Sequence, residues 1–174
     1  MPDTGKIQQN VSVQSFQPFN GDNQTIAMYG VNYKPCESVS LFAGGGLDTN
    51  LKDYAGGVVD LKGNVAFNAN YGVQTRVRTY AGDGKLATQV RISPYVQENV
   101  GKNVTLYVNP YYAYKADYLT PDKSNHSLGI FGGANFKVND KTVIFAEIQR
   151  YNLQNPTDNS PRNWSANVGI TYKF

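Results

Sequence analysis

Residues 163–174 decide the fold, and they read NWSANVGITYKF. From Trp164 to Phe174, apolar or aromatic side chains alternate with polar or small ones without exception. Successive side chains of a β-strand point to opposite faces of its sheet. Strict alternation therefore predicts a strand with one apolar face and one polar face.

The same alternation extends backward through the chain and predicts an all-β protein. It is weaker over the first third, where the glycine runs 44–46 and 56–57 blur it. One expected strand, over 65–78, is longer than the ~5–6 residues usual in globular sheets. We expect ten strands in all, over residues 11–16, 24–33, 39–47, 54–61, 65–78, 88–97, 104–112, 127–138, 144–149 and 163–174.

The connections between these strands alternate between short and long. Short turns are expected at 34–37, 62–64, 99–102 and 139–140, and longer polar segments at 17–23, 48–53, 81–85, 118–126 and 154–162. Outer-membrane barrels show this organisation, with short periplasmic turns and longer outer loops. We predict one domain over 1–174, a closed antiparallel transmembrane β-barrel of eight to ten strands, ten favoured, with a disordered N-terminal segment over 1–9.

Composition excludes several other classes. Charged residues make up 17% of the chain, and no run of Lys or Arg marks a nucleic-acid-binding arm. The single cysteine, Cys36, excludes an intrachain disulfide, and we expect neither a metal site nor a cofactor. No stretch has the ~20 apolar residues of a membrane-spanning helix. The first residues lack the regions of a signal peptide, which we expect to have been removed.

Alternation alone does not say which face of the barrel is the inner one. A soluble ligand-binding barrel has its apolar face inside, and this alternative stays open. The polar face here is rich in Asn, Gln, Ser and Gly rather than in the mixed charges of a solvated surface, which favours a hydrated lumen. Aromatic residues collect toward strand ends, as the interfacial girdles of a membrane barrel require: Trp164, Tyr112 and Tyr114 at one end, Phe136, Tyr172 and Phe174 at the other.

The end of the chain resembles the C-terminal signature of bacterial outer-membrane proteins. The matching residues are Val168, Ile170, Tyr172 and the terminal Phe174. The resemblance implies an outer-membrane location in a Gram-negative bacterium and recognition of the last strand by the barrel-assembly machinery. It also implies the lipid bilayer and lipopolysaccharide as partners.

Cationic residues on the polar face suggest a solute path. Arg76, Arg78, Arg91 and Lys115 share that face, and form a ladder that would draw anionic solutes, as in the small porins for acidic sugars that the chain loosely resembles. The alternative is a structural role, in which these cations pair with Glu147 and with networks of Asn and Gln side chains inside a closed, filled barrel. The lumen candidates beside the ladder are Glu147, Tyr95 and Tyr111.

Two further groups lie near the expected outer rim. Arg150 and Arg162 are candidates for contact with lipopolysaccharide phosphates, because a guanidinium pairs well with phosphate oxygens. His126 and Ser127 resemble part of the active site of an outer-membrane lipid A deacylase. Adjacent strand residues point to opposite faces, however, and the strand that would supply the deacylase motif has neither residue type. We therefore expect no enzyme activity.

These observations leave several functions open. The leading one is a narrow outer-membrane channel for small anionic solutes such as acidic sugars. The alternatives are a non-conducting surface protein that binds partners through its outer loops, the C-terminal barrel of a larger polysaccharide exporter, and the soluble ligand-binding barrel.

Overall fold

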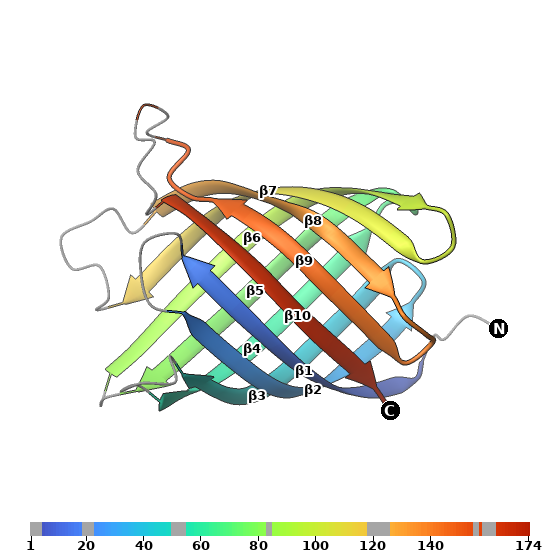
Figure 1. The fold of residues 1–174 in the computed structure, drawn as a ribbon, viewed down its shortest axis with the longest axis horizontal. Coiled ribbons are helices and arrows are strands. Elements are labelled where there is room, and N and C mark those ends of the chain that lie inside the picture. Colours follow the sequence, from blue (N-terminus) through green and yellow to red (C-terminus); the bar gives the residue numbers. More distant parts are fainter. Residues whose placement is uncertain are drawn as a thin grey trace.

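The protein folds as a closed antiparallel barrel of ten strands (Figure 1). The computed structural model describes residues 5–18, 23–49, 55–82, 85–117, 126–154, 157 and 163–174, without the side chains of 18, 85 and 115–117. None of the described segments is a helix long and apolar enough to cross a membrane. The strands are β1 (Ile7–Pro18), β2 (Gln24–Cys36), β3 (Val39–Thr49), β4 (Ala55–Ala66), β5 (Tyr71–Gly82), β6 (Lys85–Val100), β7 (Val104–Asp117), β8 (His126–Lys137), β9 (Thr142–Arg150) and β10 (Trp164–Lys173).

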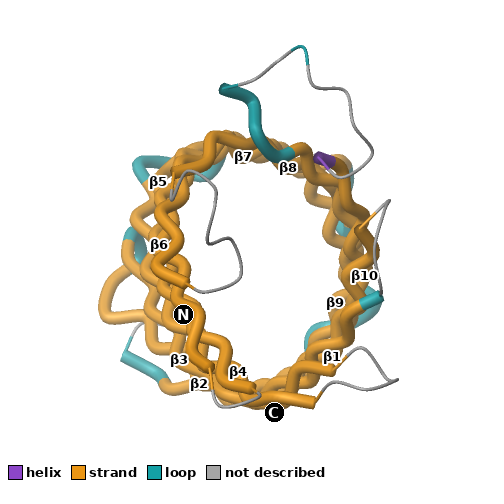
Figure 2. The backbone as a smooth tube through the Cα atoms, turned by 90° about the vertical axis from the view of Figure 1, so that its left-hand side faces the viewer, coloured by secondary structure: helices purple, strands orange, loops and turns teal. Residues whose placement is uncertain are grey.

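Pairing of the first and last strands closes the sheet. Each strand pairs with its sequence neighbours, and β1 pairs with β10 from Asn10↔Lys173 to Pro18↔Ser165. Figure 2, which looks along the barrel, shows the resulting ring. Closure leaves no sheet edge, so the strands supply one another's backbone hydrogen bonds, as a sheet in lipid requires. The predicted ten-stranded closed barrel is confirmed.

The apolar face of every strand points outward. Leu47, Val96 and Phe67 are each more than 60% exposed on the outer surface, whereas Asp60 and Ser93 are at most 1% exposed inside. A water-soluble protein of this size hides its large apolar side chains, and a barrel surrounded by lipid exposes them. The outer face of this barrel therefore has the character of a lipid-facing surface.

The hairpin between β4 and β5 differs from the sequence-based expectation. The expected turn at 62–64 is wrong, as is the continuous strand over 65–78, because the chain turns at residues 67–70. Asn68 fixes this turn, since its Oδ1 accepts hydrogen bonds from the backbone nitrogens of Asn70 at 2.8 Å and Tyr71 at 3.0 Å. Phe67 continues the apolar alternation into the turn, which is why the sequence pattern reads through it.

The first strand begins earlier than expected. Disorder over 1–9 is wrong for residues 7–9, because β1 begins at Ile7 and pairs there with Tyr33 of β2. This pairing satisfies backbone groups that would otherwise lie at the end of the closing strand.

The described turns lie together at one end of the barrel. Residues 37–38, 67–70, 101–103 and 138–141 form these turns, and the start of β1 and the C-terminus lie at the same end (Figure 1). The turns expected at 34–37, 99–102 and 139–140 are thus placed to within a few residues. The longer connections expected at the opposite end fall largely outside the described residues. We call the two ends the short-turn end and the loop end.

Candidate functional site

Three cations stand side by side on the inner wall. The sheet register places Lys62 of β4 opposite Arg76 of β5, and Arg76 opposite Arg91 of β6. Like charges directly opposite each other on one face of a sheet are destabilising. This row of cations, Lys62–Arg76–Arg91, therefore needs a specific local explanation.

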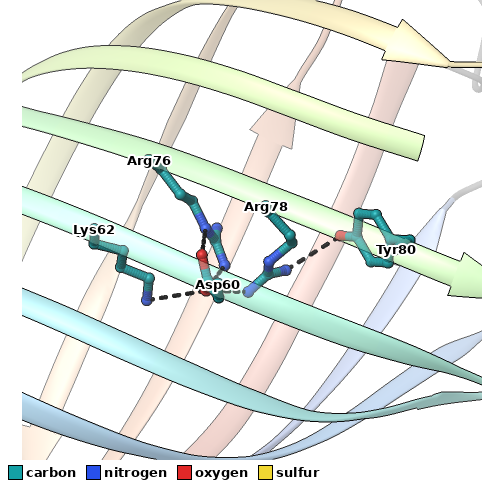
Figure 3. Close-up of polar contacts among 5 residues, drawn as sticks. All are labelled: Asp60, Lys62, Arg76, Arg78 and Tyr80. Atoms are coloured by element: carbon teal, nitrogen blue, oxygen red, sulfur yellow. Dashed lines mark hydrogen bonds and ion pairs between the residues drawn. The ribbon is translucent and has the colours of Figure 1, made fainter. Parts of the chain in front are cut away.

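Asp60 of β4 organises the first half of the row (Figure 3). Arg76 donates two hydrogen bonds to its carboxylate, from Nε at 2.7 Å and from Nη2 at 2.6 Å. Arg78 donates a third from Nη2 at 2.7 Å, and the Nζ of Lys62 lies 3.6 Å from the same carboxylate. Asp60 itself is fully buried. One carboxylate thus serves three cations, and the cluster keeps a net charge of about +2.

Arg91 turns away from Arg76 toward the opposite neighbours. Its guanidinium carbon lies 4.7 Å from the ring centroid of Phe131 on β8 and 5.2 Å from that of Tyr111 on β7. Cations are attracted to the faces of aromatic rings. Arg76 leans toward β4 and Arg91 toward β7 and β8, and this divergence relieves their repulsion.

The rings that receive Arg91 belong to a packed cluster. Tyr111 and Phe131 are each 5% exposed, with centroids 6.0 Å apart. The Nε2 of Gln149 donates a hydrogen bond to the Tyr111 hydroxyl at 2.7 Å, and Tyr107 donates one to Glu147 at 3.1 Å. Glu147 thus bonds a tyrosine of this cluster, and the carboxylate that pairs with Arg76 and Arg78 is Asp60.

A second set of lumen residues lies nearer the loop end of β2–β5. Ile26, Met28 and Val58 form a buried apolar cluster, against which Phe42 and Tyr80 pack. Tyr80 also accepts a hydrogen bond from Nη1 of Arg78 at 3.3 Å. The sequence pattern did not single out this apolar patch, because inward positions were expected to be polar.

The remaining lumen candidates are placed as follows. Tyr95 faces inward, and its hydroxyl accepts a hydrogen bond from Nδ2 of Asn64 at 3.5 Å. Gly72 makes room for it, because a Cβ there would lie 2.6 Å from the Tyr95 hydroxyl oxygen. The Lys115 side chain lies outside the described residues, although the register places the residue opposite Gln89, next to the row.

The rim candidates do not share one face of the barrel, and one of them lies outside the described residues. Arg150 lies at the end of β9, with its guanidinium carbon 5.1 Å from the Trp164 ring centroid. Arg162 falls outside the described residues. His126 contacts Tyr112 and Tyr114 on the outer face. Ser127 is registered with the buried Ala113 on the inner face, so His126 and Ser127 form no joint site.

The residues of the C-terminal signature lie on the strand that closes the barrel. Val168, Ile170 and Tyr172 point outward from β10, and Phe174 follows it at the short-turn end. Tyr172 and Phe174 form an edge-to-face pair with centroids 5.1 Å apart. The signature residues therefore form one continuous outer surface beside β1.

A closed barrel with an apolar outer face and charged residues inside defines a transmembrane β-barrel of the outer-membrane type. Residues 3–174 match the family described as Porin subfamily, and the chain belongs to this porin family. Family and fold together indicate a channel rather than an enzyme. Comparison with curated proteins finds no match.

Solved structures with a similar fold include porins and an autotransporter domain. KdgM porin is 13% identical with a TM-score of 0.54, over 95% of this chain and 99% of that one. A second structure, "KdgM porin in complex with disordered oligogalacturonate", has a TM-score of 0.53 with the same identity and coverage. The β-domain of the Bordetella autotransporter BrkA is 13% identical with a TM-score of 0.51, over 99% of this chain and all of that domain. At these identities the likeness concerns the fold alone.

Proposed function

We propose that this porin is a narrow channel that favours small anionic solutes. The carrying observation is the row Lys62–Arg76–Arg91 with its neighbour Arg78, because the two nearby carboxylates, Asp60 and Glu147, neutralise only part of these four positive charges. An interior selected for stability alone would balance these charges, whereas an uneven balance leaves a positive potential for a solute.

The guanidinium groups keep hydrogen-bond donors for such a solute. Arg91 stacks its face on Phe131 and Tyr111, and this contact does not occupy the N–H groups in the plane of the guanidinium. A guanidinium has five N–H donors in a planar fork that matches a carboxylate. Acidic sugars fit this chemistry, since their carboxylates would pair with the guanidinium groups of the row. The oligogalacturonate named with KdgM porin is a solute of this class.

Selectivity measurements in planar bilayers test the proposal. The barrel is refolded and the reversal potential is recorded in a gradient of potassium chloride, for wild type and for Arg76→Gln/Arg91→Gln. Each of the two charges lies about 5 Å from a passing ion and, in water-like surroundings, changes the occupancy of that ion about fourfold. Removal of both charges should therefore lower the anion preference by about an order of magnitude.

A matched variant controls for net charge. Lys34→Gln/Lys141→Gln removes two charges at the short-turn end, where Lys141 is exposed in its turn. This variant should keep the wild-type preference. A folded wild-type barrel that shows no conductance would contradict the channel, and equal effects of both double variants would contradict the role of the row.

We propose the orientation and the lipid contact from the same geometry. The short-turn end faces the periplasm and the loop end faces outward, as in other outer-membrane barrels. Arg150 then lies at the outer rim beside Trp164, where its guanidinium would meet lipopolysaccharide phosphates. Arg150→Gln should reduce the thermal stabilisation that added lipopolysaccharide gives the refolded barrel. An unchanged stabilisation would contradict this contact.

A further inference from the structure

A half-open cavity with mainly polar lining residues lies at the short-turn mouth of the barrel, and several of these residues, among them Lys102 and Asp140, are exposed. Its volume is about 590 Å³, within the range of pockets that hold small ligands. The turn between β6 and β7, the turn between β8 and β9, and the inner faces of β7–β10 form its walls. None of its lining residues belongs to the row Lys62–Arg76–Arg91 or to the packed cluster of Tyr107, Tyr111 and Phe131. It is therefore a separate site.

Three lysines from three different elements converge on this cavity. Lys102 comes from the β6–β7 turn, Lys137 from the end of β8 and Lys173 from the end of β10. Asp140 is the carboxylate in the lining, and it lies 2.7 Å from the Nζ of Lys137. The lining thus has two more cations than anions. Amides, among them Asn103 and Asn135, and threonine hydroxyls supply neutral donors and acceptors.

Hydrogen bonds hold the walls of the cavity together. The backbone nitrogen of Lys137 donates to the Asn103 carbonyl at 2.8 Å, which joins the end of β8 to the β6–β7 turn. Asn139 Oδ1 accepts from the backbone nitrogens of Lys141 at 2.9 Å and Thr142 at 2.8 Å. The lysines therefore project from fixed backbone positions, and a ligand need not order the turns when it binds.

We propose that this cavity binds a small polyvalent organic anion, one that carries several carboxylates together with hydroxyl groups. A monovalent ion engages one ammonium at a time, whereas a polyvalent anion engages lysines from separate walls at once. The amides and hydroxyls then bond its uncharged groups. The site holds such an anion at the short-turn mouth independently of how the row in the lumen acts on solutes.

Side-dependent block of the single channel tests the site. Citrate is added to one side of the bilayer at neutral pH, with acetate as the monovalent comparison, and the block of chloride current is recorded. We expect block at low citrate concentration from the short-turn side and little from acetate. Lys102→Gln/Lys173→Gln should raise the citrate concentration for half block about 25-fold, at about fivefold for each of the two charges in water.

Two variants separate the site from general electrostatics. Asp140→Asn removes the carboxylate of the lining and releases Lys137, so the concentration for half block should fall about fivefold. Lys34→Gln/Lys141→Gln removes two charges from the same end outside the lining and should leave the block unchanged.

Binding of citrate to the refolded barrel is measured in parallel by calorimetry. This measurement tests the cavity even if the barrel shows no conductance. No binding, equal block by acetate, or equal effects of the two lysine double variants would overturn the proposal. Loss of anion selectivity in Arg76→Gln/Arg91→Gln tests the lumen alone. Failure of one site is therefore distinguishable from failure of the other.

Discussion

Replacement of Asp60 by Asn tests how the row of cations is held together. The change keeps the shape of the side chain and removes its negative charge. Asp60 is fully buried and receives three hydrogen bonds of 2.6–2.7 Å from Arg76 and Arg78. Removal of one partner from a buried ion pair destabilises by about 3–5 kcal/mol. The side chains of Lys62 and Arg76 are 32% and 15% exposed, so water screens part of the repulsion. We expect about 3 kcal/mol.

The assay is urea unfolding in lipid vesicles, followed by the fluorescence of Trp164, the only tryptophan. Asp48→Asn is the matched control. Asp48 is 1% exposed on β3 and accepts a hydrogen bond from Gln24, but no Lys or Arg of the described chain forms an ion pair with it. Its replacement should be clearly milder. Asp60→Asn should also increase the anion preference about fourfold. Equal destabilisation by both variants, or a lower anion preference, would refute the reasoning.

Three further predictions concern packing, orientation and pH. A Cβ at Gly129 would overlap the Tyr111 ring, so Gly129→Ala should destabilise by about 1–3 kcal/mol in the same assay, whereas Gly57→Ala, with no described atom within 4 Å, should not. Cys36 is exposed at the short-turn end, so a membrane-impermeant maleimide should label it only after the outer membrane is permeabilised; labelling of intact cells would reverse the proposed orientation. Lys137 holds the pKa of Asp140 below its usual range, so the carboxylate stays charged until acidic pH. As the pH falls through that lowered pKa, the pair is lost and the mouth gains positive charge, so block by sulfate should strengthen in wild type but not in Asp140→Asn.

Alternation in the sequence was enough to predict the strands, since each strand has a lipid-facing and a lumen-facing side. The last strand was expected over 163–174 and is found at Trp164–Lys173. The pattern failed at the β4–β5 hairpin, where Phe67 and Tyr71 flank the turn on the lipid side with centroids 6.2 Å apart. Aromatic residues continue the alternation of apolar and polar residues across this interfacial turn. The alternation alone therefore does not show where the chain reverses direction.

Because the turn was expected at the wrong position, the sequence did not predict that Asp60 pairs with the arginines. Arg76, Arg78 and Arg91 were correctly expected on a common inner face, because side-chain parity along each strand suffices for that. Which residue lies opposite which depends on the position of the turn. Only a turn at 67–70 places Asp60 opposite Arg78 and Lys62 opposite Arg76. The contact of Arg91 with Phe131 joins side chains two strands apart and depends on barrel curvature, which no linear pattern records.

The two halves of the row give Arg76 and Arg91 different roles. Arg76 donates two of its five N–H groups to Asp60, so a solute anion near it competes with a carboxylate that is already in place. The buried Nε of Arg91 has no hydrogen-bond partner among the described residues, and the face of its guanidinium lies over the Tyr111 ring. A ring attracts a cation without occupying its N–H groups. Arg91 should therefore be the stronger contact for an anion, and Arg76 the group that keeps the wall positive beside it. The single variant Arg91→Gln should then reduce anion preference more than Arg76→Gln, although each removes one charge from neighbouring positions on the same wall.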